Sequence, residues 1–336
     1  MSDWYIKDLG PKSFEPLTDL KASFEIRTGG LTVLERIILK RGSSPDGFLC
    51  EDALRAEMIS ARTGLQHCKE PLSSNDIEIQ KADTPWGLLD KLPNQLQSDL
   101  DEAEQFDLLP DVVIIGDCRV DISPTATVHP NVVFDATHGA IRVEANATIR
   151  PHAVLIGPCW VGQDSIIYEH SLIKMNTVIG PMCKIGGEVG GTIFQGFSNK
   201  CHEGHLGDSI IGEWVNFGSG TTNSNLLNTY SDVILQDLAG KRHKTGRAYV
   251  GCFIGDHVKF GICSRIMTGT IVGTGAMIAS TNPVPSPTPR FNWVTDNGTK
   301  LYRIEKFIEV AKIVMARRNQ DLHKSAEQVI RHLAGA

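Results

Sequence analysis

The stretch VEANATIRPHAVLIGPCWVGQDSIIYEHSLIKMNTVIGPMCKIGGEV, which runs from Val143 to Val189, repeats with a period of six residues. A branched aliphatic residue returns at every sixth position: Val143, Ile149, Leu155, Val161, Ile167, Ile173, Ile179 and Ile185. Four positions after each comes a small or compact residue: Ala147, Ala153, Cys159, Ser165, Ser171, Thr177, Cys183 and Val189. Neither the 3.6-residue period of a helix nor the two-residue period of a single strand produces this spacing.

A six-residue repeat is typical of a hexapeptide solenoid, in which short strands wind into a parallel β-helix. The repeat continues on both sides, with interior positions expected at Ile122, Val128, Phe134, Phe197, Ile211, Phe217, Ile254, Phe260, Ile266, Val272 and Ile278. We therefore predict a mainly β protein whose solenoid spans residues 111–282. The period breaks at about 223–249, where Val233-Ile-Leu and the Gly240 turn indicate a hairpin or extended loop. Loops that leave a rigid repeat commonly carry function.

The N-terminal residues are not repetitive and predict a small α/β head over residues 1–110. Helical patterns occupy residues 31–40, with Thr32 as a possible cap, 50–63 and 86–106.

The C-terminal residues 290–336 predict two further helices, at 301–316 and 325–333. A solenoid end exposes unpaired strand edges, which invite aggregation. We therefore expect these helices to cap the end of the solenoid.

The composition narrows the class of protein. A formal net charge of -6 argues against a nucleic-acid-binding protein, which usually has a basic face. No apolar run approaches the ~20 residues of a membrane span, and the first residues lack the basic and apolar regions of a signal peptide. The 8 cysteines form no CxxC pair, so we interpret them as reduced, mostly as core fillers. These features predict a protein of the cytoplasm.

Two segments carry a resemblance to a known family: Ser198-Asn-Lys-Cys-His-Glu-Gly-His-Leu-Gly-Asp and Gly212-Glu-Trp-Val-Asn-Phe-Gly-Ser-Gly-Thr-Thr-Asn-Ser-Asn. With Lys184-Ile-Gly-Gly-Glu-Val and the head segments 14–18 and 24–36, they resemble a group of sugar nucleotidyltransferase-like proteins. The group includes alternative bacterial forms of the bifunctional N-acetylglucosamine-1-phosphate uridyltransferase and glucosamine-1-phosphate acetyltransferase, which serves UDP-N-acetylglucosamine biosynthesis. The resemblance implies a left-handed parallel β-helix, acyl transfer with acetyl-CoA as co-substrate, and homotrimers with active sites between neighbouring solenoids. Because residues 1–110 are few for a nucleotidyltransferase domain, we interpret the head as a reduced nucleotidyltransferase-like relic or a docking module.

The resemblance also implies roles for single residues. Counting back from the Leu-Gly-Asp sequence places His202 at the family's general base, and an imidazole suits the proton transfer of acyl transfer. Asn225 falls where the family has an asparagine near the acyl carbonyl and the pantetheine arm, and Glu188 where it has a glutamate near the acceptor. The family's acceptor-phosphate lysine falls on Gly190 or Gly191, a departure that argues against glucosamine-1-phosphate itself. The predicted acceptor is therefore an amino sugar phosphate or a nucleotide sugar.

Further polar residues near these segments are candidate ligands. The candidate substrate contacts are Lys184, Asn199, Lys200 and Arg150, the last for an acceptor phosphate. Lys241 and Lys244 lie in a basic run that could bind the phosphates of CoA or of the sugar. A solvated loop is an equal interpretation of that run.

Several alternatives stay open. His205 could partner His202 or replace it as the base, and Cys201 could carry the acyl group, although its position favours a core filler. A zinc hydratase of carbonic-anhydrase type would need three histidines in one register. His152, His170 and His202 have spacings of 18 and 32 residues, which do not fit one register, so we predict no metal site.

Two other functions also stay open. The head could make a UDP-sugar by sugar-1-phosphate nucleotidyl transfer with Mg²⁺, although we find no glycine-rich phosphate loop in it. The solenoid could also be a non-catalytic scaffold, because a fold by itself specifies no reaction.

Overall fold

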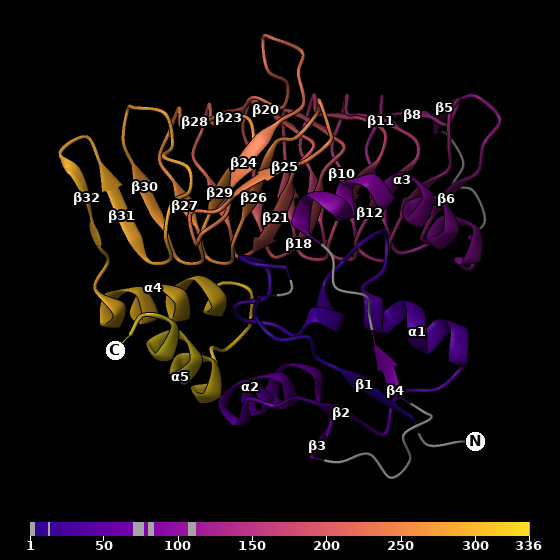
Figure 1. Cartoon of the computed structure of the whole chain (residues 1–336). Coiled ribbons are helices and arrows are strands. Elements are labelled where there is room, and N and C mark those ends of the chain that lie inside the picture. The colour runs from indigo at the N-terminus through magenta and orange to yellow at the C-terminus, as the bar shows by residue number, and fades with distance from the viewer. Residues whose placement is uncertain (1–3, 13, 70–76, 80–83, 107–111, 336) are drawn as a thin grey trace.

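The computed structural model describes residues 4–12, 14–69, 77–79, 84–106 and 112–335, and for residues 77–79 it describes the backbone only. Figure 1 shows a long β-helix with the head below it and the C-terminal helices beside the head. The chain is therefore mainly β, as the hexad repeat predicts.

The solenoid is built from three parallel sheets, which we call the first, second and third sheet. The first sheet contains β5 (Val113–Ile115), β8 (Val133–Asp135), β11 (Val154–Ile156), β14 (Leu172–Ile173), β17 (Glu188–Gly190) and β20 (His205–Gly207). The second sheet contains β6 (Val120–Ile122), β9 (Ile141–Val143), β12 (Cys159–Val161), β15 (Thr177–Ile179), β18 (Ile193–Gly196), β21 (Ile210–Glu213), β26 (Cys252–Ile254) and β29 (Thr270–Val272). The third sheet contains β7 (Thr127–Val128), β10 (Thr148–Ile149), β13 (Ile166–Ile167), β16 (Lys184–Ile185), β19 (Asn199–Lys200), β22 (Asn216–Phe217), β27 (Lys259–Phe260), β30 (Met277–Ala279) and the hairpin β31 (Asn292–Thr295) and β32 (Gly298–Leu301). A further pair, β23 (Thr222–Asn223) and β28 (Arg265–Ile266), continues the coils beyond β20.

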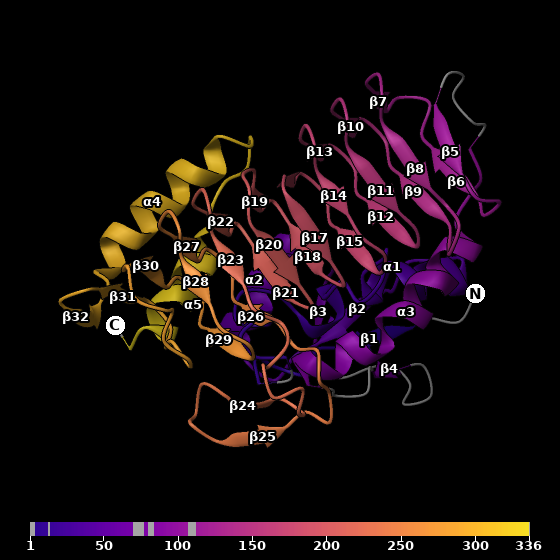
Figure 2. The ribbon, with the colours of Figure 1, turned by 90° about the horizontal axis from the view of Figure 1, so that it is seen from above.

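Each turn of the chain passes from the first sheet to the second and then to the third. Followed from its N-terminal end in Figures 1 and 2, this order winds with a left-handed sense. The hexad residues from Val143 to Ile185 are all fully buried in the interior. The left-handed parallel β-helix is thus confirmed.

One coil is shorter than its neighbours. Ile167 pairs with Ile185, 18 residues later, but Ile185 pairs with Lys200 after only 15 residues. Because of this change of phase, Phe194 fills the interior and Phe197 lies half-buried on the outside. The prediction of Phe197 as an interior residue is therefore wrong.

The head is a small α/β unit. Its parallel sheet contains β1 (Tyr5–Lys7), β2 (Gly47–Leu49), β3 (His67–Cys68) and β4 (Ile77–Ile79), and its helices are the 3-10 turn Ser23–Glu25, α1 (Val33–Arg41), α2 (Ala53–Thr63) and α3 (Pro85–Glu102). Thr32 caps α1, since its hydroxyl accepts a 3.1 Å hydrogen bond from the Glu35 amide. Asp52 caps α2, so that helix begins after Cys50 rather than at it.

The head covers the outer face of the second sheet. That face is apolar in six coils, with Trp160, Val178, Ile193, Ile210, Phe253 and Ile271 packed in one cluster with α3 leucines such as Leu92 and Leu96. The fully buried Lys21 of the head also reaches the solenoid, 2.9 Å from Asp256 and 3.2 Å from Glu213. Apolar contact and buried ion pairs together fix the head to the coils.

The predicted excursion is a hairpin of β24 (Ile234–Gln236) and β25 (Arg242–Lys244). It packs against the head, because the His243 ring lies 5.1 Å from that of Trp86 and Arg247 forms an ion pair with Asp90 of α3.

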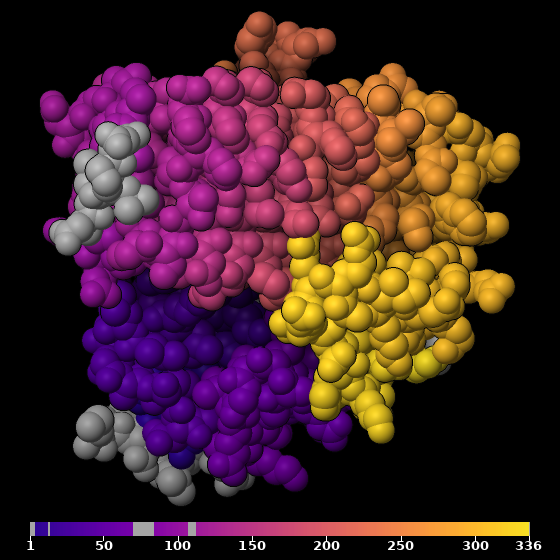
Figure 3. Space-filling model, turned by 180° about the vertical axis from the view of Figure 1, so that it is seen from behind, coloured from indigo at the N-terminus to yellow at the C-terminus, as the bar shows by residue number. Residues whose placement is uncertain are grey.

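The C-terminal helices are α4 (Ile304–Ala316) and α5 (Lys324–Leu333). Their apolar faces complete the core of the head, where Phe307 and Ile330 share one cluster with Phe24 and Phe48. Figure 3 shows these C-terminal residues, in yellow, seated in the angle between solenoid and head. The helices therefore cover the side of the solenoid rather than its end, where the β31–β32 hairpin extends the third sheet. Within the described ranges, none of the helices has both the length and the apolar character needed to cross a bilayer.

Candidate active site

Two residues of opposite chemical character face each other on the outer side of the first sheet. Glu188 of β17 pairs in register with His205 of β20, and Oε1 of Glu188 lies 3.4 Å from Nδ1 of His205. Lys174 Nζ donates a hydrogen bond to the same carboxylate oxygen. This hydrogen bond, opposed by partial burial and aided by His205, holds the pKa of Glu188 below its usual range. The ionised carboxylate can thus fix the orientation of the His205 ring.

Gly207, two residues further along β20, leaves space beside the imidazole. A Cβ atom at Gly207 would lie 2.7 Å from both Nε2 of His205 and Nδ2 of Asn225. Nε2 of His205, which faces away from Glu188, therefore lies over the backbone of Gly207. The amide of Asn225 lies over the same backbone. An imidazole nitrogen, which can accept a proton, and an amide hydrogen-bond donor therefore meet at one point.

Two neighbouring polar residues hold this arrangement. Asn225 Nδ2 donates a 2.7 Å hydrogen bond to Asp208 Oδ2, which orients the amide. Burial raises the pKa of Asp208, and the Asn225 hydrogen bond opposes that rise. From the interior, Asn223 accepts from the Gly207 amide and donates to the Gly207 carbonyl, both at 2.9 Å. The backbone of Gly207 is thereby clamped.

Lys200 lies inside the solenoid, which corrects its prediction as a substrate contact. It is 2% exposed and occupies an interior position between Ile185 and Phe217. Its ammonium donates to the carbonyls of Gly186, at 2.8 Å, and His202, at 3.0 Å. Burial lowers the pKa of Lys200 to about 8. Lys200 therefore holds the corner between β19 and β20 instead of binding substrate.

His202 lies at this corner and is exposed. In the part of the chain that the structure describes, its imidazole has no hydrogen-bond partner, whereas that of His205 is held by Glu188. Cys201, beside His202, is half-buried, and burial raises the pKa of its thiol. A raised pKa disfavours the thiolate that a nucleophile needs.

The other predicted ligands are spread over the surface. Lys184 and Asn199 lie on the outer face of the third sheet, around the corner from Glu188, and line a cavity beneath α4. Arg150 lies two coils before Glu188, where it pairs with Glu169 at 2.8 Å. Arg150 therefore does not join the cluster around His205.

Lys241 and Lys244 are exposed on the β24–β25 hairpin. The hairpin contacts the head and β29 of the second sheet, so the structure does not bring these lysines to the cluster around His205.

The histidines considered for zinc do not converge. His152 and His170 stack on neighbouring coils with ring centroids 5.1 Å apart, but the corner of His202 lies two coils beyond His170. Among the described residues, no group of three or more His, Cys, Asp or Glu side chains is placed to hold a metal ion.

Sequence reasoning missed Lys174 and Gly207, although a signal existed. In the first sheet, outward-facing positions alternate with the interior hexad positions. At one outward position β11 has Ile156 and the next strand is followed by Lys174, whereas β17 and β20 have Gly190 and Gly207. A Cβ at Gly190 would lie 3.1 Å from the Lys174 side chain. Glycines at outward positions of a coil indicate that neighbouring side chains fold over them.

The chain is similar over part of its length to known bifunctional proteins. No protein family profile matches the chain. The chain is 35% identical over 142 residues to the bifunctional sugar-1-phosphate nucleotidylyltransferase/acetyltransferase of Sulfurisphaera tokodaii, which covers 42% of this chain and 35% of that protein. It is 28% identical over 215 residues to the bifunctional protein GlmU of Methanococcus aeolicus, which covers 63% of this chain and 47% of that protein. The chain thus spans less than half the length of these relatives.

Among solved structures, the acetyltransferase domain of PglB from Neisseria gonorrhoeae in complex with acetyl coenzyme A aligns with 89% of this chain and 100% of that one. The sequence identity is 13% and the TM-score is 0.18.

Proposed function

We propose that the protein is an acyltransferase that moves an acyl group, such as acetyl, from acyl-CoA to an amino sugar phosphate or a nucleotide sugar. The observation that carries the proposal is the meeting of His205 Nε2 and the Asn225 amide over Gly207, with Glu188 behind the imidazole. The similarity to bifunctional sugar nucleotidyltransferase/acetyltransferases supports the choice of donor and acceptor.

The proposed reaction has one displacement. His205 Nε2 takes the proton of the acceptor amine or hydroxyl as that group attacks the thioester carbonyl. The Asn225 amide, oriented by Asp208, donates to the oxygen on which negative charge develops. The C–S bond then breaks, the new C–N or C–O bond remains, and the CoA thiolate takes up a proton.

His202 is the competing base. The resemblance favours His202 by alignment. The contacts favour His205, because its ring, unlike that of His202, is oriented by a carboxylate among the residues that the structure describes. Glu188 and Lys174 are proposed to face the acceptor. Lys174 lies over Gly190 and supplies from the preceding coil the cation that the family has after the glutamate.

We further propose that the chain works as a homotrimer in the cytoplasm and serves the formation of an N-acetylated nucleotide sugar of the UDP-N-acetylglucosamine type. Support for assembly comes from the first sheet, whose outer face is uncovered in Figure 2. Val113 and Ile115 on that face are 51% and 49% exposed. A neighbouring solenoid would bury these residues and would bring its own surface to His205.

The test is release of free CoA from acetyl-CoA across a panel of amino sugar phosphates and nucleotide sugars. His205→Ala should lower kcat by ~10²–10⁴-fold, the usual contribution of a general base. His202→Ala should lower kcat by less than about tenfold, because no residue in the described part of the chain orients that ring. The opposite ranking would transfer the role to His202. Absence of CoA release with every acceptor, together with no acetyl-CoA binding at millimolar concentration, would favour a scaffold.

A further inference from the structure

A second polar cluster lies on the outer face of the third sheet. Lys184, Asn199, Asn216 and Lys259 are successive partners across four neighbouring coils. Parallel strands lie ~4.8 Å apart, so two lysines enclose two amides in a straight row of roughly 14 Å. These four side chains point outward, so packing of the solenoid interior does not require lysine or asparagine at their positions.

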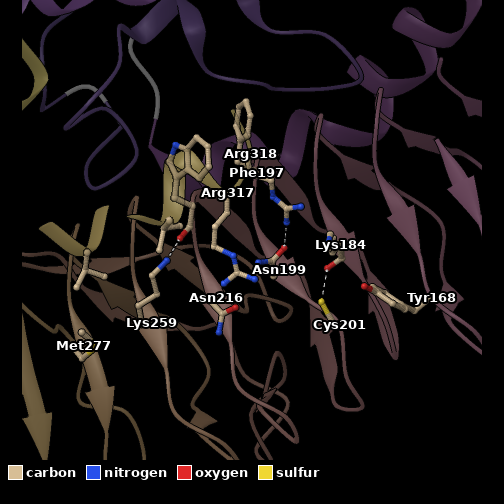
Figure 4. Close-up of a pocket in the computed structure, with 13 residues that line it drawn as sticks. Tyr168, Lys184, Phe197, Asn199, Cys201, Asn216, Lys259, Met277, Arg317 and Arg318 are labelled. Atoms are coloured by element: carbon tan, nitrogen blue, oxygen red, sulfur yellow. Dashed lines mark hydrogen bonds between the residues drawn. The ribbon is translucent and has the colours of Figure 1, made fainter. Parts of the chain in front are cut away.

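The C-terminal end of α4 lies over this row. Arg317 and Arg318 follow the last residue of that helix, and the Arg318 guanidinium donates a 2.8 Å hydrogen bond to Asn199 Oδ1. Figure 4 shows both arginines extending toward the sheet, next to Asn216 and Asn199. A cavity of about 640 Å³ separates the helix from the strands. That volume falls within the usual range for small-molecule and cofactor sites.

The charges around this cavity are not neutralised. Lys184, Lys259, Arg317 and Arg318 line it, and its lining contains no aspartate or glutamate. Within the described part of the chain, none of the four cations has a carboxylate within ion-pair distance. Burial lowers the pKa of Lys259 to about 8. Four cations with no carboxylate partner among the described residues, around one half-enclosed space, favour a ligand with several negative charges.

The lining of the cavity also contains apolar and aromatic side chains. Phe197 stacks on Trp214 with ring centroids 4.3 Å apart, and Val310 and Val314 of α4 face the same space. A ligand that satisfies both kinds of lining residue carries phosphate groups together with a flat or apolar group. A nucleotide has this combination.

We propose that this cavity binds a nucleotide through its diphosphate, with Lys184, Lys259, Arg317 and Arg318 as the phosphate ligands. The diphosphate could belong to a nucleotide sugar or to the adenosine diphosphate part of CoA, which share this chemistry. The proposal does not rest on acyl transfer at His205, because the two clusters lie on different sheets and share no residue.

The test is calorimetry on the full chain with UDP, inorganic pyrophosphate and CoA. At least one of the three should bind with Kd below about 1 mM at low salt, and the affinity should fall as salt rises. Lys184→Gln and Arg317→Gln should each weaken binding roughly tenfold, the effect of one lost charge-assisted hydrogen bond. Lys40→Gln, an exposed lysine on α1, is the matched control and should leave the affinity unchanged.

The outcomes separate this site from the proposed function. Binding that persists in His205→Ala, where CoA release is lost, supports a distinct site. Binding of CoA but not UDP, with the same sensitivity to Lys184→Gln, assigns the cavity to the donor and still supports diphosphate recognition. No binding of the three probes at about 5 mM, or equal affinity in the wild type and in both variants, overturns the proposal.

Discussion

Glu188 Oε1 lies 3.4 Å from His205 Nδ1 across neighbouring coils, and Lys174 donates to the same oxygen. The carboxylate is thus held between an ammonium group and an imidazole. A carboxylate in this position accepts from Nδ1–H and leaves Nε2 as the free base. The relation matters more than either residue alone, because it fixes both the tautomer and the direction of the ring.

Glu188→Gln should therefore lower kcat by ~10–100-fold, the usual effect of losing a partner that orients a functional histidine. The glutamine can present its NH₂ group to Nδ1 and so favour the wrong tautomer. Steady-state kinetics should show the change in kcat, with the free energy of unfolding nearly unaltered. Glu169→Gln removes another carboxylate, one that pairs with Arg150, and should leave kcat unchanged.

Gly207→Ala should abolish most of the activity without unfolding the protein. The new methyl group would lie 2.7 Å from both His205 Nε2 and Asn225 Nδ2, so both side chains must move. A displacement of about 1 Å at reacting groups can cost ~10²-fold in rate. Gly261→Ala is the matched control in the solenoid, because its Cβ would approach nothing closer than 3.2 Å. Equal activity in the two variants would show that Gly207 is not part of the site.

Lys200→Met should lower kcat while the free energy of unfolding changes by only about 1 kcal/mol. The methionine avoids the cost of burying an ammonium whose pKa is lowered to about 8, and that gain offsets two lost hydrogen bonds. The carbonyls of Gly186 and His202 lose their donor, so the corner before β20 becomes less rigid. Chemical denaturation and kinetics together check this. A large loss of stability with normal kcat per folded molecule would contradict it.

His257→Phe should reduce the sensitivity of the fold to acid. His257 is buried beside Trp214, and among the described residues its Nδ1 has no hydrogen-bond partner. Burial lowers the pKa of His257 from 6.5 to about 3, so between these pH values the unfolded chain binds a proton that the folded chain does not. Its contribution to stability is complete above pH 6.5 and is lost as pH falls toward 3, on the order of a few kcal/mol.

Urea unfolding of the wild type and of His257→Phe at pH 7 and pH 5 should show the smaller decrease in the variant. Asp256, whose pKa is raised to about 6 mainly by burial, titrates in both proteins and cancels in the comparison. His138→Phe changes an exposed histidine and should keep the wild-type pH dependence. An identical pH dependence in all three proteins would contradict the assignment.

Much of the fold could be predicted because the interior of a solenoid imposes a strict rule. Every position from Val143 to Ile185 that fills the core must be apolar at intervals of six, so the spacing determines which side chains point inward. Handedness is absent from that spacing and came from the resemblance. The wrong assignments of Phe197 and Lys200 have one cause, the coil of 15 residues that shifts the phase between Ile185 and Lys200.

The packing of the head could have been predicted from a different pattern. Six coils have two adjacent apolar residues on the second sheet, such as Trp160 with Val161 and Phe253 with Ile254. The first residue of each pair points outward, where a solvated face would be polar. The position of α4 over the third sheet has no comparable signal, because its neighbours there mix lysines and asparagines with apolar residues such as Met277.

The candidate site was predicted only in part. Glu188 and Asn225 were predicted from the resemblance, but their relation to His205 depends on which residues of successive coils fall in register. Register across a short coil cannot be counted from a regular hexad. Contacts such as Lys174 with Glu188 therefore required the three-dimensional structure.

The row from Lys184 to Lys259 also restricts how the length of the cavity can change. Each coil adds one strand spacing of ~4.8 Å to the row. The row can therefore become longer or shorter only by whole coils if the sheets are to stay in register. The reach of the cavity is thus adjustable in discrete steps. Removing the coil that carries Asn216 would bring Asn199 next to Lys259 and shorten the row by one strand spacing. A relative with one coil more or fewer at this point would be matched to an anion of correspondingly different length.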